Sequence, residues 1–209
     1  MRNILKRSIQ NRCEKNEASS QVIKERGYIY GQGRQPQDQL RIGPWGRGGS
    51  HGCGPFAVYN ALYALDKNCK SDKPELQPPN RSADPADIIR FFEEKGGFNL
   101  GGLLGSNPWT LVKCLKSKGH KAKISYLPRK IDRQLKENPV NILMYFWRKG
   151  FKIGGHYVMI RYIDEEYQIY NEHGNDTTQH TYPSIEKWIT KGGRSGRLKL
   201  VPTAIIKCQ

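Results

Sequence analysis

Cys53 has the surroundings of a nucleophile. It opens the segment CGPFAVYNALYAL, in which apolar residues recur with helical spacing and Pro55 suits the first turn of a helix. A thiol attacks as its thiolate, and the unpaired N–H groups and the dipole at a helix N-terminus favour that negative charge. Gly52 and Gly54 would leave room for a carbonyl substrate, and the N–H of Cys53 could help to bind an oxyanion. The competing interpretation is a buried structural cysteine.

A histidine is the expected base for such a thiol, and His156 fits best. It stands in GGHYVMIRYID as a polar residue at the start of an otherwise apolar strand, and Gly154-Gly155 keeps its approach open. The other candidates fit less well. His51 is too close to Cys53 in the sequence, His120 follows the end of a helix, and His180 lies in a polar stretch. The competing interpretation of His156 is a core or edge histidine with a structural partner.

Hairpin geometry suggests a third member of the site. If the chain turns at Asp164-Glu165, the numbers of opposed residues add to 329, so His156 faces His173 and Asn171 lies diagonally across from His156 on the same face. Such diagonal neighbours are about 7 Å apart, so the Asn171 side chain could fix the orientation of the imidazole. A slip of one residue would turn Asn171 to the other face. The substitutes would then be His173, Asn175 and Asp176.

The hydrophobic periodicity predicts helices first and a mostly antiparallel sheet afterwards, which is an α+β arrangement. Expected helices cover residues 53–65, 85–94 and 108–118, with proline in each first turn, and Ser82 or Asp84 and Asn107 as caps. Expected strands cover residues 121–127, 141–147, 156–163, 167–171 and 198–206, with short helices possible at 131–137 and 184–190. Residues 1–27 are expected to form a basic N-terminal extension with one short helix at 3–11, and residues 28–209 the catalytic domain.

Composition narrows the class of protein. The 209 residues include 35 Lys and Arg against 19 acids, a formal charge of +16. Residues 95–152 carry 13 of the basic residues and two acids. Such a surface attracts anions of any kind, or it simply keeps the protein soluble. The cysteines are odd in number and lack CxxC spacing, which argues against a disulfide framework and a zinc site: Cys13, Cys53, Cys69, Cys114 and Cys208. We expect no metal and no cofactor.

The same segments resemble a known family. GCGPFAVYNAL at 52–62, GGHYVMI at 154–160 and IYNEH at 169–173 resemble the papain-like cysteine peptidases, and within them the bacterial peptidases that trim double-glycine leader peptides. The order Cys, His, Asn and the gap of roughly 100 residues between the first two agree with that family. The resemblance implies a papain-like fold with the nucleophile helix packed on the sheet. It also implies a catalytic triad of Cys53, His156 and Asn171.

One position departs from the family pattern. Such peptidases usually place a glutamine a few residues before the cysteine, where its amide binds the oxyanion, but the residue six positions before Cys53 is Arg47. The next glutamine upstream is Gln39, followed further upstream by Gln37, Gln35 and Gln32. A longer loop could bring Gln39 into place. Arg47, or a backbone N–H alone, would be the other solutions.

The resemblance implies a thiol peptidase that hydrolyses protein or peptide substrates through an acyl-enzyme. The same triad could instead pass the acyl group to an amine or alcohol, as in an acyltransferase or transglutaminase, or act as a deamidase. A basic module that binds nucleic acid or a membrane surface is a different class, but nucleic acid is not favoured because no zinc knuckle or GxxxxGK loop is present. With no signal peptide and no apolar run of transmembrane length, we expect the chain as given to be cytoplasmic, which leaves secretion by another route open.

Overall fold

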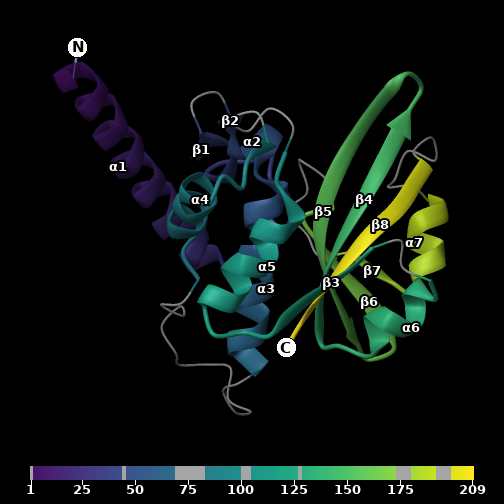
Figure 1. The fold of residues 1–209 in the computed structure, drawn as a ribbon. Coiled ribbons are helices and arrows are strands. Elements are labelled where there is room, and N and C mark those ends of the chain that lie inside the picture. The colour runs from purple at the N-terminus through teal and green to yellow at the C-terminus, as the bar shows by residue number, and fades with distance from the viewer. Residues whose placement is uncertain are drawn as a thin grey trace.

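The structure, a computed structural model, describes residues 2–43, 46–68, 83–99, 105–126, 129–172, 180–191 and 199–209. In that part of the chain a layer of helices covers one face of a six-stranded antiparallel sheet, and two shorter helices lie on the other face (Figure 1). The predicted α+β arrangement, with helices first and strands later, is confirmed.

The helical layer contains the three helices that the sequence predicts. They are α3 (Cys53–Asn68), α4 (Pro85–Glu94) and α5 (Pro108–Ser117). Asp84 and Asn107 cap α4 and α5, and each side chain accepts a hydrogen bond from the backbone two residues later. Four short elements before α3 were not predicted: η1 (Gln37–Gln39), β1 (Arg41–Ile42), β2 (Gly46–Arg47) and α2 (Gly48–His51).

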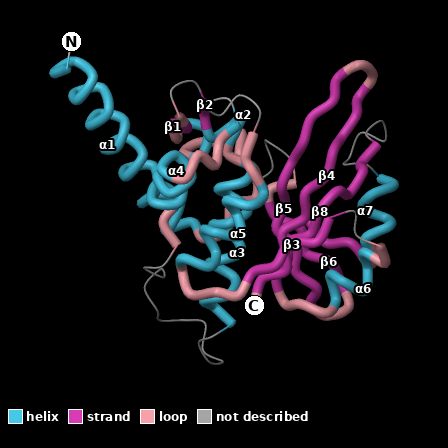
Figure 2. The backbone as a smooth tube through the Cα atoms, in the orientation of Figure 1, coloured by secondary structure: helices cyan, strands magenta, loops and turns pink. Residues whose placement is uncertain are grey.

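The sheet has the strand order β3-β8-β4-β5-β6-β7. Its strands are β3 (Ala122–Tyr126), β4 (Val140–Lys149), β5 (Lys152–Ile163), β6 (Glu166–Tyr170), β7 (His180–Tyr182) and β8 (Lys199–Cys208). The outer helices are α6 (Ile131–Lys136) and α7 (Ile185–Lys191). The short strand β7 lies in a polar stretch that gave no strand signal. Figure 2 shows β4 and β5 as a long hairpin, and β8 pairs with β4 as far as Arg148.

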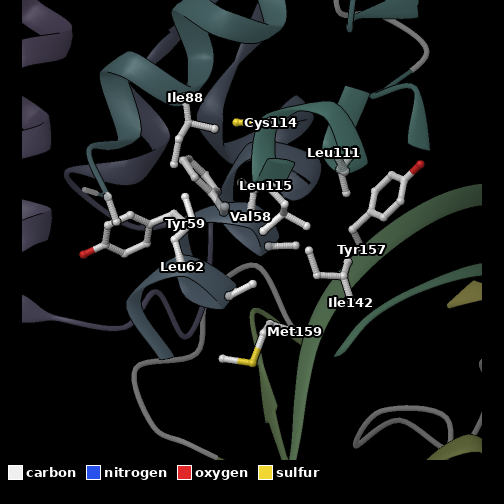
Figure 3. Packing of buried hydrophobic residues seen from close by; sticks show 14 of the residues in the cluster. Val58, Tyr59, Leu62, Ile88, Leu111, Cys114, Leu115, Ile142, Tyr157 and Met159 are labelled. Carbon is white, nitrogen blue, oxygen red and sulfur yellow. The ribbon is translucent and has the colours of Figure 1, made fainter. Parts of the chain in front are cut away.

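Two buried clusters hold these layers together. In the first, α3 packs against α4 and α5 on one side and against the sheet on the other, as Figure 3 shows for Val58, Leu62 and Met159. Cys114 is buried in this cluster, as predicted for a small apolar residue. In the second, the opposite sheet face packs against Leu135 of α6 and Trp188 of α7. The sheet is therefore covered on both faces.

The N-terminal helix differs from the expectation of a short helix at 3–11. A single helix, α1 (Arg2–Arg26), runs through the segment, and its second half packs against α4. Ile23 is buried there, and the Ser20 hydroxyl accepts a hydrogen bond of 2.7 Å from the N–H of Ala86. Lys24 and Asp84 form an ion pair at 3.1 Å. Contacts from this half of α1 thus reach residues 60 positions or more away in the sequence.

Asp84 joins α1 to α4, so its replacement should destabilise the fold. Burial raises the pKa of Asp84, but hydrogen bonds from Lys24, the N–H of Ala86 and Ser20 outweigh it and lower the pKa overall. Asp84→Ala should cost about 1 kcal/mol in the free energy of unfolding measured with urea at neutral pH. The difference from wild type should shrink as the pH falls and the carboxyl is protonated, because a lowered folded pKa stabilises only above it. Asp87→Ala, an exposed acid on the same helix turn, is the matched control, and equal losses in both variants would contradict the prediction.

Candidate active site

Cys53 is the first residue of α3 and its side chain is only 6% exposed. Burial raises the pKa of the thiol to about 11, and the backbone N–H groups of Tyr157, Gly54 and Cys53 itself act in the opposite direction. The N–H groups of Cys53 and Gly54 belong to the first turn of the helix, where no carbonyl of the helix can pair with them. The sulfur therefore lies among backbone donors but is protonated at neutral pH unless a base removes its proton.

The glycines beside Cys53 have a packing role that the sequence did not indicate. A side-chain carbon at Gly54 would collide with Ser106, and one at Gly52 would collide with the ring of Phe56. The space that we expected these glycines to leave for substrate is thus filled by protein atoms. The Ser106 hydroxyl is buried and has no hydrogen-bond partner in the part of the chain that the structure describes.

The pairing of β5 with β6 explains why a backbone N–H of β5 reaches the sulfur. Asp164 and Glu165 both have positive φ (51° and 62°), as a two-residue type I′ turn requires, and the opposed residues add to 329 as predicted. The last pair of this ladder is Met159 with Tyr170, so β6 no longer pairs with β5 at the position of Tyr157. The Tyr157 N–H points to that edge. There it lies close enough to the Cys53 sulfur to oppose the rise in the pKa of the thiol. Tyr157 directly follows His156 in the sequence.

His156 is half-buried and hydrogen-bonds to the end of β6. Its Nε2 lies 2.6 Å from the backbone carbonyl oxygen of Asn171, and its ring meets that of Tyr145 edge-on at 5.6 Å between centroids. A carbonyl oxygen can only accept, so Nε2 carries the proton of the neutral imidazole. This tautomer makes Nδ1 the basic nitrogen of His156.

Asn171 orients His156 through its backbone, whereas we expected its side chain to do so. The residue has φ 62°, in the left-handed region that asparagine tolerates better than most residues, and this conformation ends β6 at Tyr170. Its side chain is fully buried and points to Gln32 instead: Nδ2 donates to Gln32 Oε1 at 3.2 Å. Gln32 Nε2 in turn donates to the carbonyl of Gly49 at 3.0 Å. Gln32 thereby connects the end of β6 to α2, the helix that leads into Cys53.

Glu172 anchors the residue that follows Asn171. Its carboxylate is buried and accepts hydrogen bonds from Trp188 Nε1 at 2.8 Å and from the Tyr182 hydroxyl at 2.9 Å. His180 Nδ1 lies 2.9 Å from the same carboxylate. Three partners fix the chain immediately after the carbonyl that holds His156. No motif in the sequence singles out Gln32 or Glu172, because their partners come from distant segments.

The other histidines have partners elsewhere or lie outside the described residues. The Nδ1 atom of His51 accepts from the N–H of Arg47, His120 lies 3.6 Å from Asp66, and His180 pairs with Glu172. The substitutes considered for a slipped register fall outside the residues that the structure describes: His173, Asn175 and Asp176.

The expected oxyanion donor, Gln39, ends η1 and has an exposed side chain. Arg47 is exposed as well. The glutamine that reaches the site is Gln32, but its amide is engaged with Asn171 and Gly49. The backbone N–H groups that act on the sulfur are those of Tyr157, Gly54 and Cys53, two of them at the start of α3.

Two further observations concern the described residues as a whole. They contain no group of three or more His, Cys, Asp or Glu side chains that could hold a metal ion. Among them, no helix is both long enough and apolar enough to cross a bilayer.

Comparison with known proteins gives similarity of structure only. No family model and no curated protein matches the chain. The chain is similar to the peptidase domain of Streptococcus ComA, a bifunctional ABC transporter involved in quorum sensing, with 15% identity over 75% of this chain and 91% of that one and a TM-score of 0.41. It is also similar to a double-glycine-motif protease from an AMS/PCAT transporter, determined with its leader peptide, with 15% identity over 84% and 96% of the two chains and a TM-score of 0.38.

Proposed function

We propose that the protein is a cysteine peptidase in which Cys53 is the nucleophile and His156 the base. The observation that carries this proposal is the position of the Cys53 sulfur. It lies at the N-terminus of α3, where the N–H of Tyr157 favours its thiolate. His156 precedes Tyr157 in the sequence, and the Asn171 carbonyl orients its ring by accepting a hydrogen bond from Nε2. A thiol at a helix N-terminus and an imidazole held in one orientation are the two groups that thiol acyl transfer requires.

The chemistry follows from the protonation states. Since burial keeps the thiol neutral at rest, Nδ1 of His156 removes the proton as the sulfur attacks the amide carbonyl. The imidazolium that forms is stabilised by the Asn171 carbonyl, which accepts from Nε2–H. His156 then gives its proton to the leaving amine, the C–N bond breaks, and an acyl-enzyme remains. Water, deprotonated by His156, releases the acid product and restores the thiol.

The oxyanion of this reaction would be bound by the backbone. The N–H groups of Cys53 and Gly54 lie beside the sulfur at the first turn of α3, and helix N-termini bind negative charge. Under this proposal backbone N–H groups bind the oxyanion, and Gln39 is not needed for it. A side-chain donor is therefore not part of the proposal.

Substrate selection is proposed from charge and sequence. The basic excess of residues 95–152 favours peptides with acidic side chains. The motif at 52–62 resembles that of double-glycine leader peptidases, so peptides with two glycines before the cleaved bond are the first substrates to try.

The pH dependence of alkylation tests the proposed thiol and base. Cys53 should react with iodoacetamide at neutral pH in the wild type, because His156 takes up the proton. In His156→Ala the rate should rise about tenfold per pH unit toward the thiol pKa of about 11, because burial disfavours the thiolate and no imidazole takes up the proton. Peptide mass spectrometry identifies the labelled cysteine, and Cys53→Ala is the blank. An unchanged pH profile in His156→Ala would show that the two residues do not act together.

Product mass distinguishes hydrolysis from transfer. A cleavable peptide incubated with and without a primary amine should give the free acid in both cases if water is the acceptor. A product that carries the amine would mean that the Cys53–His156 pair serves an acyltransferase, the alternative function of the same site.

A further inference from the structure

The hairpin formed by β4 and β5 carries an exposed apolar surface at its far end. Four of the seven exposed large hydrophobic residues of the described chain gather there, three on the hairpin and one on β8, which pairs with β4. We call them the hairpin patch: Phe146 (44% exposed), Phe151 (102%), Ile153 (70%) and Val201 (56%). Figures 1 and 2 show the turn of this hairpin at one end of the sheet, away from α3 and α5.

The strand register places most of the hairpin patch on one face. Phe146 is opposite Val201 of β8, and Ile153 is opposite Arg148, two residues after Phe146 on β4. Nearer the middle of the sheet, the same face carries Met144 and packs against the helical layer. The patch begins where that helical cover ends.

The opposite face of the hairpin is covered in the ordinary way. Trp147 lies against Gly154, where a side-chain carbon would collide with the indole, and Leu200 packs in the cluster that contains Trp188 of α7. One face of the hairpin therefore packs against the rest of the protein. The patch lies on the other face, on the three adjacent strands β5, β4 and β8.

The tip is convex, and an aromatic ring stands on it. Lys149 pairs with Lys152, so Gly150 and Phe151 form a two-residue turn, with Gly150 at φ 60° as a type II′ turn requires. Phe151 is fully exposed. A ring on a convex turn is not enclosed by a groove of its own chain, and it can enter the planar interface of a bilayer.

The charge of the hairpin favours an anionic bilayer as that planar surface. Residues 140–163 contain four Lys and Arg and no acid, and Arg148 and Lys152 are exposed next to the patch. Aromatic rings favour the interface of a bilayer, and basic side chains are attracted by anionic lipid headgroups. Both requirements meet within this one hairpin.

We propose that the hairpin patch docks the protein on the surface of an anionic lipid bilayer, with Phe151 and Ile153 entering the interface and Arg148 and Lys152 contacting the headgroups. The docking is peripheral and leaves the rest of the fold outside the lipid. This inference is independent of the proposed peptidase activity, because no residue of the Cys53 site takes part in it.

Vesicle sedimentation tests the proposal with the full chain. Wild type should bind vesicles of two parts phosphatidylcholine to one part phosphatidylserine, and not vesicles of phosphatidylcholine alone. Phe151→Ala should weaken binding about tenfold, since a buried aromatic ring contributes at least that much. Lys152→Glu should weaken it by more than tenfold, because it removes one favourable charge and adds an unfavourable one. Trp109→Ala and Lys116→Glu, exposed residues of α5, are the matched controls and should bind like wild type.

Phe151→Trp gives a direct readout of insertion. It should bind the anionic vesicles as well as wild type, and its additional fluorescence should be quenched by lipids brominated on their acyl chains. Failure of wild type to bind, equal binding to both kinds of vesicle, or binding unaffected by Phe151→Ala would overturn the proposal. So would an outcome in which Phe151→Ala raises the KM for a peptide substrate while vesicle binding persists, because the patch would then serve the substrate.

Discussion

Peptide cleavage should fall by about 10⁴-fold or more when Cys53 is replaced by alanine, and by a similar factor when His156 is replaced. The sulfur forms the bond to the acyl group, and no other described cysteine lies at a helix N-terminus: Cys114 and Cys208 are buried in the core. Without His156 the thiol keeps its raised pKa and loses the acceptor for its proton. The kcat/KM for a cleavable peptide is the quantity to measure.

The double variant separates a shared mechanism from two independent effects. If Cys53 and His156 act as one unit, Cys53→Ala with His156→Ala should be no slower than either single variant. Cys208→Ala and His120→Asn, a thiol and an imidazole that the proposed mechanism does not use, should leave kcat/KM near its wild-type value. Cleavage that survives Cys53→Ala would exclude the proposed nucleophile.

Local sequence signals predicted those parts of the fold that neighbouring residues determine. The start of α4 follows from Asp84 before a proline, and the start of α5 from Asn107 before a proline. The register of β5 with β6 follows from the Asp164-Glu165 turn, since a two-residue turn leaves the opposed pairs no freedom. These features need no knowledge of the rest of the chain.

The features that could not be predicted depend on distant partners. Half of α1 is held by Ser20 and Lys24 against α4, so its length is set by a contact 60 positions away or more. The short strand β7 exists because it pairs with β6, although its own residues are polar. Gln32 reaches Asn171 across 139 positions. Tertiary contacts of this kind override local propensity, which is only a weak guide.

The contact between His156 and Asn171 was predictable from the sequence, but the atoms that make it were not. Extending the β5–β6 ladder by one residue placed Asn171 near His156, and the structure does bring the two together. The extension assumed extended backbone at Asn171, whereas the residue is left-handed and turns its carbonyl, not its amide, to the imidazole. A pattern of side chains carries no information on such a change of backbone conformation.

The backbone role of Asn171 leads to the second large expected effect, a difference between two substitutions at that position. Asn171→Gly removes the side chain but keeps the left-handed conformation, which glycine adopts without strain. Its carbonyl should still accept from His156, so kcat should stay within about tenfold of wild type. Asn171→Val removes the side chain as well, but a β-branched residue strongly disfavours positive φ. The carbonyl should then turn away, and kcat should fall about 10²-fold or more.

The two variants discriminate between orientation by the backbone and by the side chain. If the Asn171 amide oriented His156, glycine and valine would lose kcat equally, and this result would contradict the geometry proposed. A pH profile separates orientation from stability, since a loss of Nε2 bonding should shift the pH dependence of kcat/KM toward that of a free imidazole. Gln32→Ala provides the complementary case. It removes the partner of the Asn171 amide at 3.2 Å while leaving the left-handed residue in place, so its loss of kcat should be closer to that of glycine than to that of valine.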